Sequence, residues 1–269
     1  MNHQLLKGKR GLIMGVANEF SIAWGIAKAF AENGAELAFT YQNDLLLRRV
    51  KPLAESIRSD YIIGCDVAND ADIDQTFENI QQKWGELDFV VHAIAFSDKN
   101  ELKGKYCHTS RGNFNTALDI SCYSFTAVCQ RAYPLMKKGG SFLTMSYYGA
   151  EKVMPNYNVM GVAKAALESS VKYIAADLGE YQIRVNSISA GPMRTLAARG
   201  IGDFNYILQW NQRNAPLRRN TTMDDIAGSA LYLASDLGAG VTGENLHVDG
   251  GYHVVGMKAI EAEDIPLVR

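Results

Sequence analysis

A tyrosine and a lysine seven residues apart form the most informative pair in the sequence. Tyr157 and Lys164 lie in a segment, 157–178, whose apolar residues follow a helical spacing. Seven residues turn an α-helix by about 700°, so both side chains would lie on one face, roughly 10 Å apart along the axis. A phenol there can donate a hydrogen bond to an oxygen that gains negative charge, and an ammonium beside it can hold hydroxyl groups. On spacing alone, chance pairing and core packing remain the stronger explanation.

Positioning such a pair requires a scaffold, and the chain predicts one built from alternating strands and helices. The expected strands are 11–15, 36–40, 61–65, 88–95, 141–146, 183–189 and 244–248. The expected helices are 22–33, 44–58, 72–84, 111–138, 157–178 and 223–235. Strands that alternate with helices of this length favour parallel pairing with right-handed crossovers. We therefore predict an α/β fold: a single-domain, doubly wound (Rossmann-like) parallel sheet of about seven strands with helices on both faces, spanning residues 1–269.

The turn between the first strand and the first helix is a candidate phosphate site. Gly15 ends the strand, and Ser21 and Ile22 open the helix. In a dinucleotide-binding fold, this turn and the helix N-terminus hold a pyrophosphate. The turn lacks the middle glycine of the GxGxxG pattern, and we expect the Ser21 hydroxyl to cap the helix and donate to phosphate. A plain strand-to-helix connection is the alternative interpretation.

The ends of the next strands predict the contacts of an adenosine. Gln42 follows the second strand, and no Arg or Lys occurs there before Arg48. Since a 2′-phosphate usually requires a cation at this point, the pattern favours NADH over NADPH. Asp66 and Val67 follow the third strand, where a carboxylate can accept from the adenine amino group. The alternative is that Asp66 only caps the next helix. Small residues such as Ala95 after the fourth strand would let a cofactor lie against the backbone.

The composition excludes several classes of function. With 27 Lys and Arg against 29 Asp and Glu, the net charge is −2, so neither nucleic acid nor an anionic membrane is expected as a partner. No apolar run approaches the roughly 20 residues that span a bilayer, and the N-terminus lacks the apolar stretch of a signal peptide. The four cysteines have no metal-binding spacing, so we expect reduced thiols, no metal site and a cytoplasmic protein.

Several stretches together make the sequence similar to one family. They are Gly15 followed by Ser21-Ile22-Ala23, Tyr157-x-x-Met160-x-x-x-Lys164, and the segments 36–42, 143–147, 155–160, 184–192, 194–197 and 247–251. On these motifs, which cover nearly the whole chain, the sequence resembles the NADH-dependent enoyl-(acyl-carrier-protein) reductases of bacterial fatty acid synthesis. These form a divergent branch of the short-chain dehydrogenase/reductase superfamily. The usual superfamily motifs, TGxxxGxG and YxxxK, are both replaced here, as they are in that branch.

This resemblance implies reduction of the 2,3 double bond of a trans-2-enoyl thioester, the last step of the fatty acid elongation cycle. It implies that Tyr157 donates to the enolate oxygen, that Lys164 binds the nicotinamide ribose, and that Tyr147 contacts the substrate. The cofactor residues that it implies are Gly15, Ser21, Ile22, Gln42, Asp66, Val67, Ala95, Lys164, Met193 and Thr195. The substrate residues that it implies are Ala95, Phe96, Tyr147, Tyr157, Met160, Ala197, Ile201 and Phe204.

The segment 193–214 is too long for a plain strand-to-helix connection. Its apolar residues would suit the cover of an acyl chain, so we expect a helical substrate lid. These residues are Leu196, Ala197, Ala198, Ile201, Phe204, Tyr206 and Ile207. A surface helix packed on the core is the alternative. Because acyl carrier proteins are acidic, a basic patch is expected near the mouth of the site, and the candidates are Arg194, Arg199, Arg213, Arg218 and Arg219.

The resemblance also implies an acyl carrier protein as the partner that bears the enoyl group, a homotetramer, and binding of triclosan-like inhibitors. The nearest alternative function is that of a 3-ketoacyl or other carbonyl reductase of the same superfamily, in which the YxxxK spacing is normal. A second alternative is a non-catalytic NAD-binding module, which the presence of both Tyr157 and Lys164 disfavours.

Overall fold

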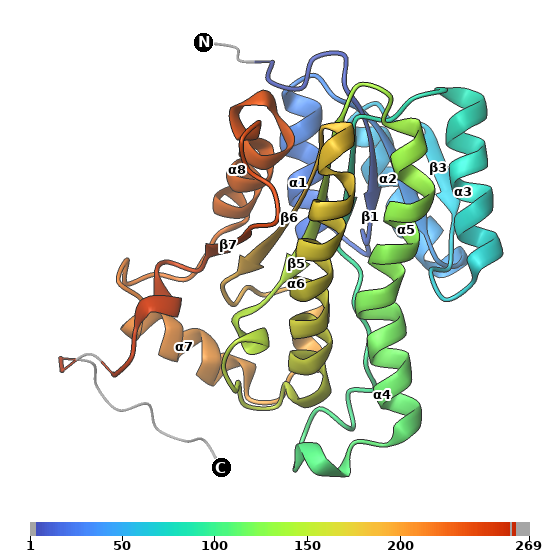
Figure 1. Ribbon diagram of the computed structural model, residues 1–269. Coiled ribbons are helices and arrows are strands. Elements are labelled where there is room, and N and C mark those ends of the chain that lie inside the picture. The colour runs from blue at the N-terminus through green and yellow to red at the C-terminus, as the bar shows by residue number, and fades with distance from the viewer. Residues whose placement is uncertain (1–3, 259, 262–269) are drawn as a thin grey trace.

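The computed structural model describes residues 4–258, 260 and 261, and these contain a parallel sheet of seven strands (Figure 1). The strand order is β3-β2-β1-β4-β5-β6-β7, which confirms the predicted doubly wound α/β fold. The strands are β1 (Arg10–Met14), β2 (Glu36–Tyr41), β3 (Tyr61–Gly64), β4 (Phe89–His92), β5 (Gly140–Ser146), β6 (Ile183–Ala190) and β7 (Asn245–Val248). The α-helices are α1 (Ile22–Glu32), α2 (Asp44–Ser56), α3 (Asp70–Lys83), α4 (Arg111–Leu118), α5 (Ser124–Ala132), α6 (Asn158–Leu178), α7 (Phe204–Asn214) and α8 (Met223–Ala234).

Two apolar cores lie on opposite faces of the sheet, because successive side chains of a strand point to opposite faces. On β1, Leu12 and Met14 pack with the buried faces of α3, α5 and α6, whereas Ile13 packs with those of α1, α2 and α8. Figure 1 shows the same division, with α5 and α6 in front of the sheet and α1 and α2 behind it. Burial on both faces explains why the strands are nearly continuous apolar runs.

The strand order reverses between β1 and β4, and this places a crevice beyond their carboxyl ends. Gly15, the first residue after β1, has φ +101°, and a Cβ there would lie 2.2 Å from the carbonyl oxygen of Ala93. Only glycine satisfies both the positive φ and this close approach. The two strand ends therefore meet at the point where a doubly wound sheet binds its ligand.

One predicted helix is wrong in extent. The expected helix 111–138 is divided into α4 and α5 by a π-helical turn, Asp119–Tyr123, and it ends at Ala132 before a 3-10 turn. A π-helical turn admits an extra residue into the helix and rotates the residues that follow it, and apolar spacing alone does not reveal it. Pro134 lacks an N–H, which explains the early end of α5.

The predicted segment 193–214 folds into a 3-10 turn, Ala197–Gly200, followed by α7. Ile207 and Leu208 on α7 are buried, while the helix lies beside the carboxyl ends of β5 and β6 in the lower part of Figure 1. In the part of the chain that the structure describes, no helix is long and apolar enough to cross a membrane.

Candidate active site

Tyr157 occupies the N-cap position of α6, and its side chain is 8% exposed. Its two neighbours have left-handed backbones, with φ +56° at Asn156 and φ +34° at Asn158. The helix therefore begins one residue later than predicted, and ideal helical rotation does not apply from Tyr157 to Asn158. Lys164 lies inside the helix and is only 6% exposed. The predicted pair is thus buried near the start of α6. The backbone conformation of Asn156 and Asn158, and not helical periodicity alone, sets the position of Tyr157.

The Lys164 ammonium is anchored at the carboxyl end of β5. Its Nζ atom donates a 2.7 Å hydrogen bond to the carbonyl oxygen of Met145, two residues before Tyr147. Burial lowers the pKa of Lys164 to about 8. Behind it on β4, burial and the positive charge of Lys164 lower the pKa of His92 to about 3, so the imidazole is neutral at pH 7. Of Lys164 and His92, therefore, only Lys164 carries a positive charge at neutral pH.

Tyr147 and Tyr157 pack edge to face, with ring centroids 5.0 Å apart and an interplanar angle of 75°. Burial raises the pKa of both phenols above the usual value of 10, so both stay protonated at neutral pH and can donate. The Tyr147 hydroxyl is buried and has no hydrogen-bond partner among the described residues. An unpaired buried hydroxyl costs on the order of 1–3 kcal/mol, which a bound acceptor would recover.

An apolar cluster surrounds the two tyrosines. It includes Met160 and Ile201, two of the predicted substrate residues. The other members are Leu102, Ala117 and Val159 together with Phe114 and Met154. Residues from four parts of the chain therefore enclose the phenol rings in an apolar setting, as a fatty acyl group requires.

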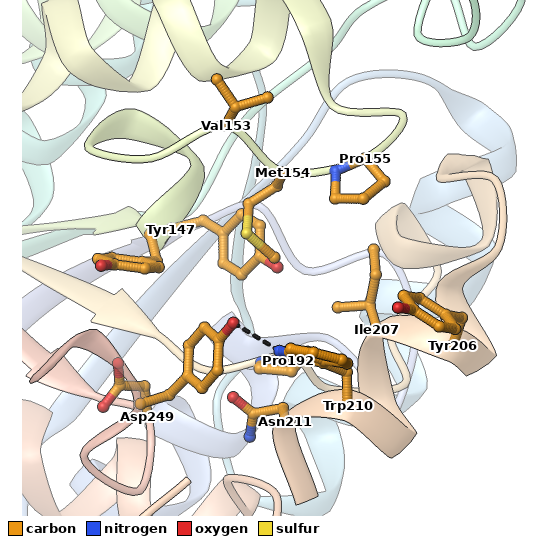
Figure 2. A pocket seen from close by; sticks show the side chains of 12 residues that line it. Tyr147, Val153, Met154, Pro155, Pro192, Tyr206, Ile207, Trp210, Asn211 and Asp249 are labelled. Atoms are coloured by element: carbon orange, nitrogen blue, oxygen red, sulfur yellow. Dashed lines mark hydrogen bonds between the residues drawn. The ribbon is translucent and has the colours of Figure 1, made fainter. Parts of the chain in front are cut away.

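A cavity of about 140 Å³ opens next to this cluster (Figure 2). Figure 2 shows Tyr147 on one side of the cavity and Ile207 of α7 on the other. At its base the indole Nε1 atom of Trp210 donates a 2.8 Å hydrogen bond to the hydroxyl of Tyr252. The lining residues are Tyr147, Tyr148, Val153, Met154, Pro155, Pro192, Tyr206, Ile207, Trp210, Asn211, Asp249 and Tyr252.

Tyr206 and Ile207 were expected in the lid, and Tyr147 was expected at the substrate, but the sequence analysis missed most of the other lining residues. Trp210 is three residues after Ile207 on α7, a helical spacing that could have placed it on the same apolar face. Phe204, the predicted contact on the same helix, is its first residue, half-buried and outside the lining. Ala197 begins the preceding 3-10 turn, and the structure does not describe its side chain.

The loop after β4 is held by the π-helical turn. The Ser121 hydroxyl accepts a 3.0 Å hydrogen bond from the N–H of Phe96 and donates to the carbonyl oxygen of the same residue at 3.2 Å. Ser121 is fully buried, whereas Ala95 and Phe96 are exposed. The sequence analysis missed Ser121, because only the π-helical geometry directs its side chain to this loop.

The predicted phosphate turn lies at the N-terminus of α1, but Ser21 does not act as predicted. Its hydroxyl oxygen accepts hydrogen bonds from the N–H groups of Ala17 and Asn18, at 3.0 and 3.1 Å, and makes no hydrogen bond to the helix. The prediction that its side chain caps the helix is therefore wrong. Ser21 instead closes the turn, and the first N–H groups of α1, which begins at Ile22, have no side-chain cap. Such uncapped groups form an anion site.

Gln42 and Asp66 meet at the ends of β2 and β3, where the Gln42 amide donates to the Asp66 carboxylate at 3.1 Å. The helix that follows is capped by Asn69, so the alternative role of Asp66 as its cap is wrong. Val67 is buried, and Arg48 is exposed one turn into α2. These residues all lie at the carboxyl edge of the sheet, along the path predicted for an adenosine.

Met193 and Thr195 follow β6 and are half-buried. The Thr195 hydroxyl accepts a 3.1 Å hydrogen bond from the N–H of Ala198, which ties this loop to the turn before α7. Both residues therefore connect the crevice to the segment that borders the cavity. Within residues 4–258, 260 and 261, no group of three or more His, Cys, Asp or Glu side chains could hold a metal ion.

Comparison with known proteins agrees with this geometry. Residues 15–253 match the family model described as enoyl-(acyl carrier protein) reductase. Enoyl-(acyl-carrier-protein) reductase (NADH) 1 of Rhizobium meliloti (strain 1021) is 63% identical over 265 residues, which is 98% of this chain and 97% of the relative. The corresponding Bacillus cereus protein, FabI, is 51% identical over 255 residues, covering 94% of this chain and 100% of the relative.

Solved structures of this family are similar to the chain in both sequence and fold. The crystal structure of the enoyl-(acyl-carrier-protein) reductase of Anaplasma phagocytophilum with NAD has 61% identity and a TM-score of 0.93, covering 97% of this chain and 98% of that one. The Bacillus cereus reductase with NADP⁺ and an indole naphthyridinone has 51% identity and a TM-score of 0.93, covering 94% of this chain and 99% of that one. The chain belongs to the enoyl-(acyl carrier protein) reductase family.

Proposed function

We propose that this protein reduces the 2,3 double bond of trans-2-enoyl groups carried on acyl carrier protein, with NADH as reductant. The observation that carries the proposal is the pair of phenols, Tyr147 and Tyr157, which are buried side by side next to an apolar cavity. The unpaired Tyr147 hydroxyl marks a place where an acceptor oxygen of a ligand would be stabilised. The names of the relatives supply the reaction and the cofactor.

The residues of the crevice fit a dinucleotide. The uncapped N-terminus of α1 suits a pyrophosphate, and the Gln42–Asp66 pair suits an adenosine. Lys164, whose ammonium is held at the Met145 carbonyl oxygen, would bind the ribose hydroxyl groups. The chemistry that a bound nicotinamide supplies is a hydride for the β-carbon of the enoyl group. We assign Gly15, Ser21, Ile22, Gln42, Asp66, Val67, Ala95, Lys164, Met193 and Thr195 to cofactor binding.

The tyrosines then stabilise the charge that the substrate gains. Addition of a hydride at the β-carbon would move negative charge to the thioester oxygen and form an enolate, and a proton added at the α-carbon would then give the saturated thioester. Tyr157 donates a hydrogen bond to that oxygen, in a buried setting where such a donor has a larger effect than in water. Tyr147 contacts the same thioester from the β5 side. We assign Met160, Ile201, Phe204, Ala197, Ala95 and Phe96 to the acyl chain and its surroundings.

A preference for NADH follows from the charges at the end of β2. Gln42 and Asp66 offer no positive charge to a 2′-phosphate, and Arg48 is one turn further along α2. The Bacillus cereus relative was crystallised with NADP⁺, so the family fold itself admits that cofactor. We therefore expect a preference for NADH and not a strict requirement.

The assembly and the location follow from the same family membership. We propose one domain over residues 1–269, with 193–214 as a substrate lid, a cytoplasmic location and a homotetramer. The position of α7, whose side chains Ile207 and Trp210 form one wall of the cavity, supports the lid. Movement of α7 would admit an acyl chain without disturbing the sheet.

The test compares two thioesters in the oxidation of NADH. The proposal predicts faster turnover of a crotonyl thioester than of an acetoacetyl thioester. Faster turnover of the ketone would favour the 3-ketoacyl reductase alternative. Binding of NADH without turnover of either thioester would favour the non-catalytic module.

A further inference from the structure

Three lysines crowd a loop at the edge of the site. Lys99, Lys103 and Lys105 are all exposed in the segment between β4 and α4. The ion pairs of the described residues involve none of the three. Asp98 and Glu101, the acidic residues of the same loop, accept hydrogen bonds from backbone and serine donors within it. The loop therefore carries three lysines against two carboxylates, and none of the lysines is held in an ion pair by those carboxylates.

The loop is fixed directly against the tyrosine site. Between the lysines, Leu102 is only 6% exposed and belongs to the apolar cluster of Tyr157. The side-chain amide of Asn158, the residue after Tyr157, contacts the carbonyl oxygens of residues 101, 103 and 104 at 3.3, 3.4 and 3.3 Å. The backbone that carries the lysines is thus held to the start of α6, one residue from the phenol.

Two of the three lysines, Lys99 and Lys103, lie close to the segment that precedes α7. A Cβ placed on Gly202 would lie 3.0 Å from the Cε atom of Lys103, and one placed on Gly200 would lie 3.8 Å from the Cβ atom of Lys99. The absence of a side chain at Gly202 therefore makes room for the stem of Lys103. The Asn156 amide, next to Tyr157, donates to the Gly202 carbonyl oxygen at 3.0 Å, which ties the turn before α7 to the start of α6. Lys99 and Lys103 therefore lie along the boundary between the fixed loop and the proposed lid.

Two of the five arginines expected to form a basic patch are paired within the chain. Arg218 pairs with Glu261 at 2.9 Å, and Arg219 is bonded to both carboxylate oxygens of Asp225. Their charges are offset by neighbours in the chain. The three lysines of the loop after β4 are exposed cations beside the tyrosine site that are not paired in this way.

We propose that Lys99, Lys103 and Lys105 form a docking surface for the acidic face of the acyl carrier protein. The inference rests on the proposed function, since it names the surface that receives the carrier of that substrate. A carrier held there would have its thioester arm beside Leu102 and Tyr157, with the 200–203 turn on the other side. Exposed cations act mainly by steering association, so they raise the rate of productive encounter and leave the chemical step unchanged.

The experiment compares carrier-bound and carrier-free substrates in the full-length enzyme. A triple variant, Lys99→Glu, Lys103→Glu and Lys105→Glu, is assayed with crotonyl-acyl carrier protein and with crotonyl-pantetheine. We expect kcat/KM for the carrier substrate to fall about tenfold or more, with kcat/KM for the pantetheine thioester unchanged. The wild-type value for the carrier substrate should also fall with added salt, and the variant should lose most of that dependence.

A matched control carries the same charge change elsewhere. Lys7, Lys28 and Lys137 are exposed and occur in no ion pair of the described residues, and Lys7 and Lys137 precede the starts of β1 and β5 at the opposite edge of the sheet. Their replacement by Glu should leave both substrates within about twofold of wild type. An equal loss for both control and loop variants, or no loss with the carrier substrate, would overturn the docking surface. A wild-type enzyme that reduces neither thioester would instead refute the proposed function, and the docking proposal with it.

Discussion

The phenol of Tyr147 meets the ring of Tyr157 edge to face, with centroids 5.0 Å apart, although the two residues come from different elements. Tyr147 follows β5, and Tyr157 precedes the first turn of α6. Below them, Lys164 donates to the carbonyl oxygen of Met145 and so ties the helix to the same strand. The arrangement supplies two protonated donors and one buried cation in an apolar enclosure.

Replacement of Tyr147 by Phe should lower activity without lowering the stability of the fold. The buried hydroxyl has no partner, so its removal should leave the free energy of unfolding unchanged or raise it by about 1 kcal/mol. Activity should fall, because the thioester oxygen loses a donor, and we expect kcat/KM for crotonyl-pantetheine to drop about tenfold. Urea unfolding and initial rates measure the two effects. A large loss of stability without a loss of activity would contradict this role.

The pH dependence of cofactor use should follow Lys164. Its pKa is lowered to about 8 by burial, so the ammonium is present below pH 8 and is lost as the pH rises through that value. We expect kcat/KM for NADH to fall about tenfold per pH unit above pH 8. In Lys164→Met the value should be low and insensitive to pH over the same range.

The same shift has the opposite sign for stability. The folded protein releases the Lys164 proton near pH 8, whereas the unfolded chain keeps it up to its usual pKa of 10.5. The unfolded state therefore binds more protons between these values, and the free energy of unfolding rises across that window relative to Lys164→Met. A difference that falls with pH would show that the charge is stabilised in the folded state.

The capping box of α8 predicts an acid-sensitive contribution. The Arg219 guanidinium, with further hydrogen bonds from Thr222, lowers the pKa of the Asp225 carboxyl below its usual value of 3.8. Asp225→Asn should therefore lower the free energy of unfolding by about 1–2 kcal/mol at pH 7. The difference should shrink as the pH falls through 3.8 toward the lower folded-state value. Asp224→Asn, one residue away and exposed, serves as the control.

Triclosan-like inhibitors should bind when NAD⁺ is present. Such molecules stack on the nicotinamide and bond to the tyrosine, and the Tyr157–Met160 cluster offers both the donor and an apolar wall. Titration should give inhibition in the presence of NAD⁺ and a loss of affinity of about tenfold in Tyr157→Phe. Absence of inhibition at saturating NAD⁺ would show that the cluster does not accept the inhibitor.

Much of the fold could be predicted, because buried parallel strands read as short apolar runs between amphipathic helices. The alternation predicts parallel strands, but it does not fix the reversal of strand order between β1 and β4, which the structure shows. The π-helical turn at 119–123 could not be predicted, since one added residue leaves the apolar spacing nearly unchanged. Its consequence, the Ser121 contact to the Phe96 backbone, was missed for that reason.

The candidate catalytic pair could be proposed from the sequence because both residues lie in one segment. The cavity wall could not, because its residues come from distant segments. Tyr157 and Lys164 stand in one motif, and both prove to be buried. The cavity wall instead combines Trp210 of α7 with Tyr252 after β7, and only the folded chain brings them together. The hydroxyl of Ser21 was misassigned, because a serine at a helix start bonds either to the helix or to its own turn, and the sequence permits both.

The most direct test of the central claim is the turnover of crotonyl-pantetheine by Tyr157→Phe at saturating NADH. The variant keeps the ring and loses only the donor, so NADH binding and thermal stability should match wild type. Tyr181→Phe, an exposed substitution, should retain full activity. We predict that kcat of Tyr157→Phe falls about 100- to 1,000-fold, as expected for the loss of a donor to a developing oxyanion. A kcat within twofold of wild type would contradict the assignment of Tyr157 to the enolate.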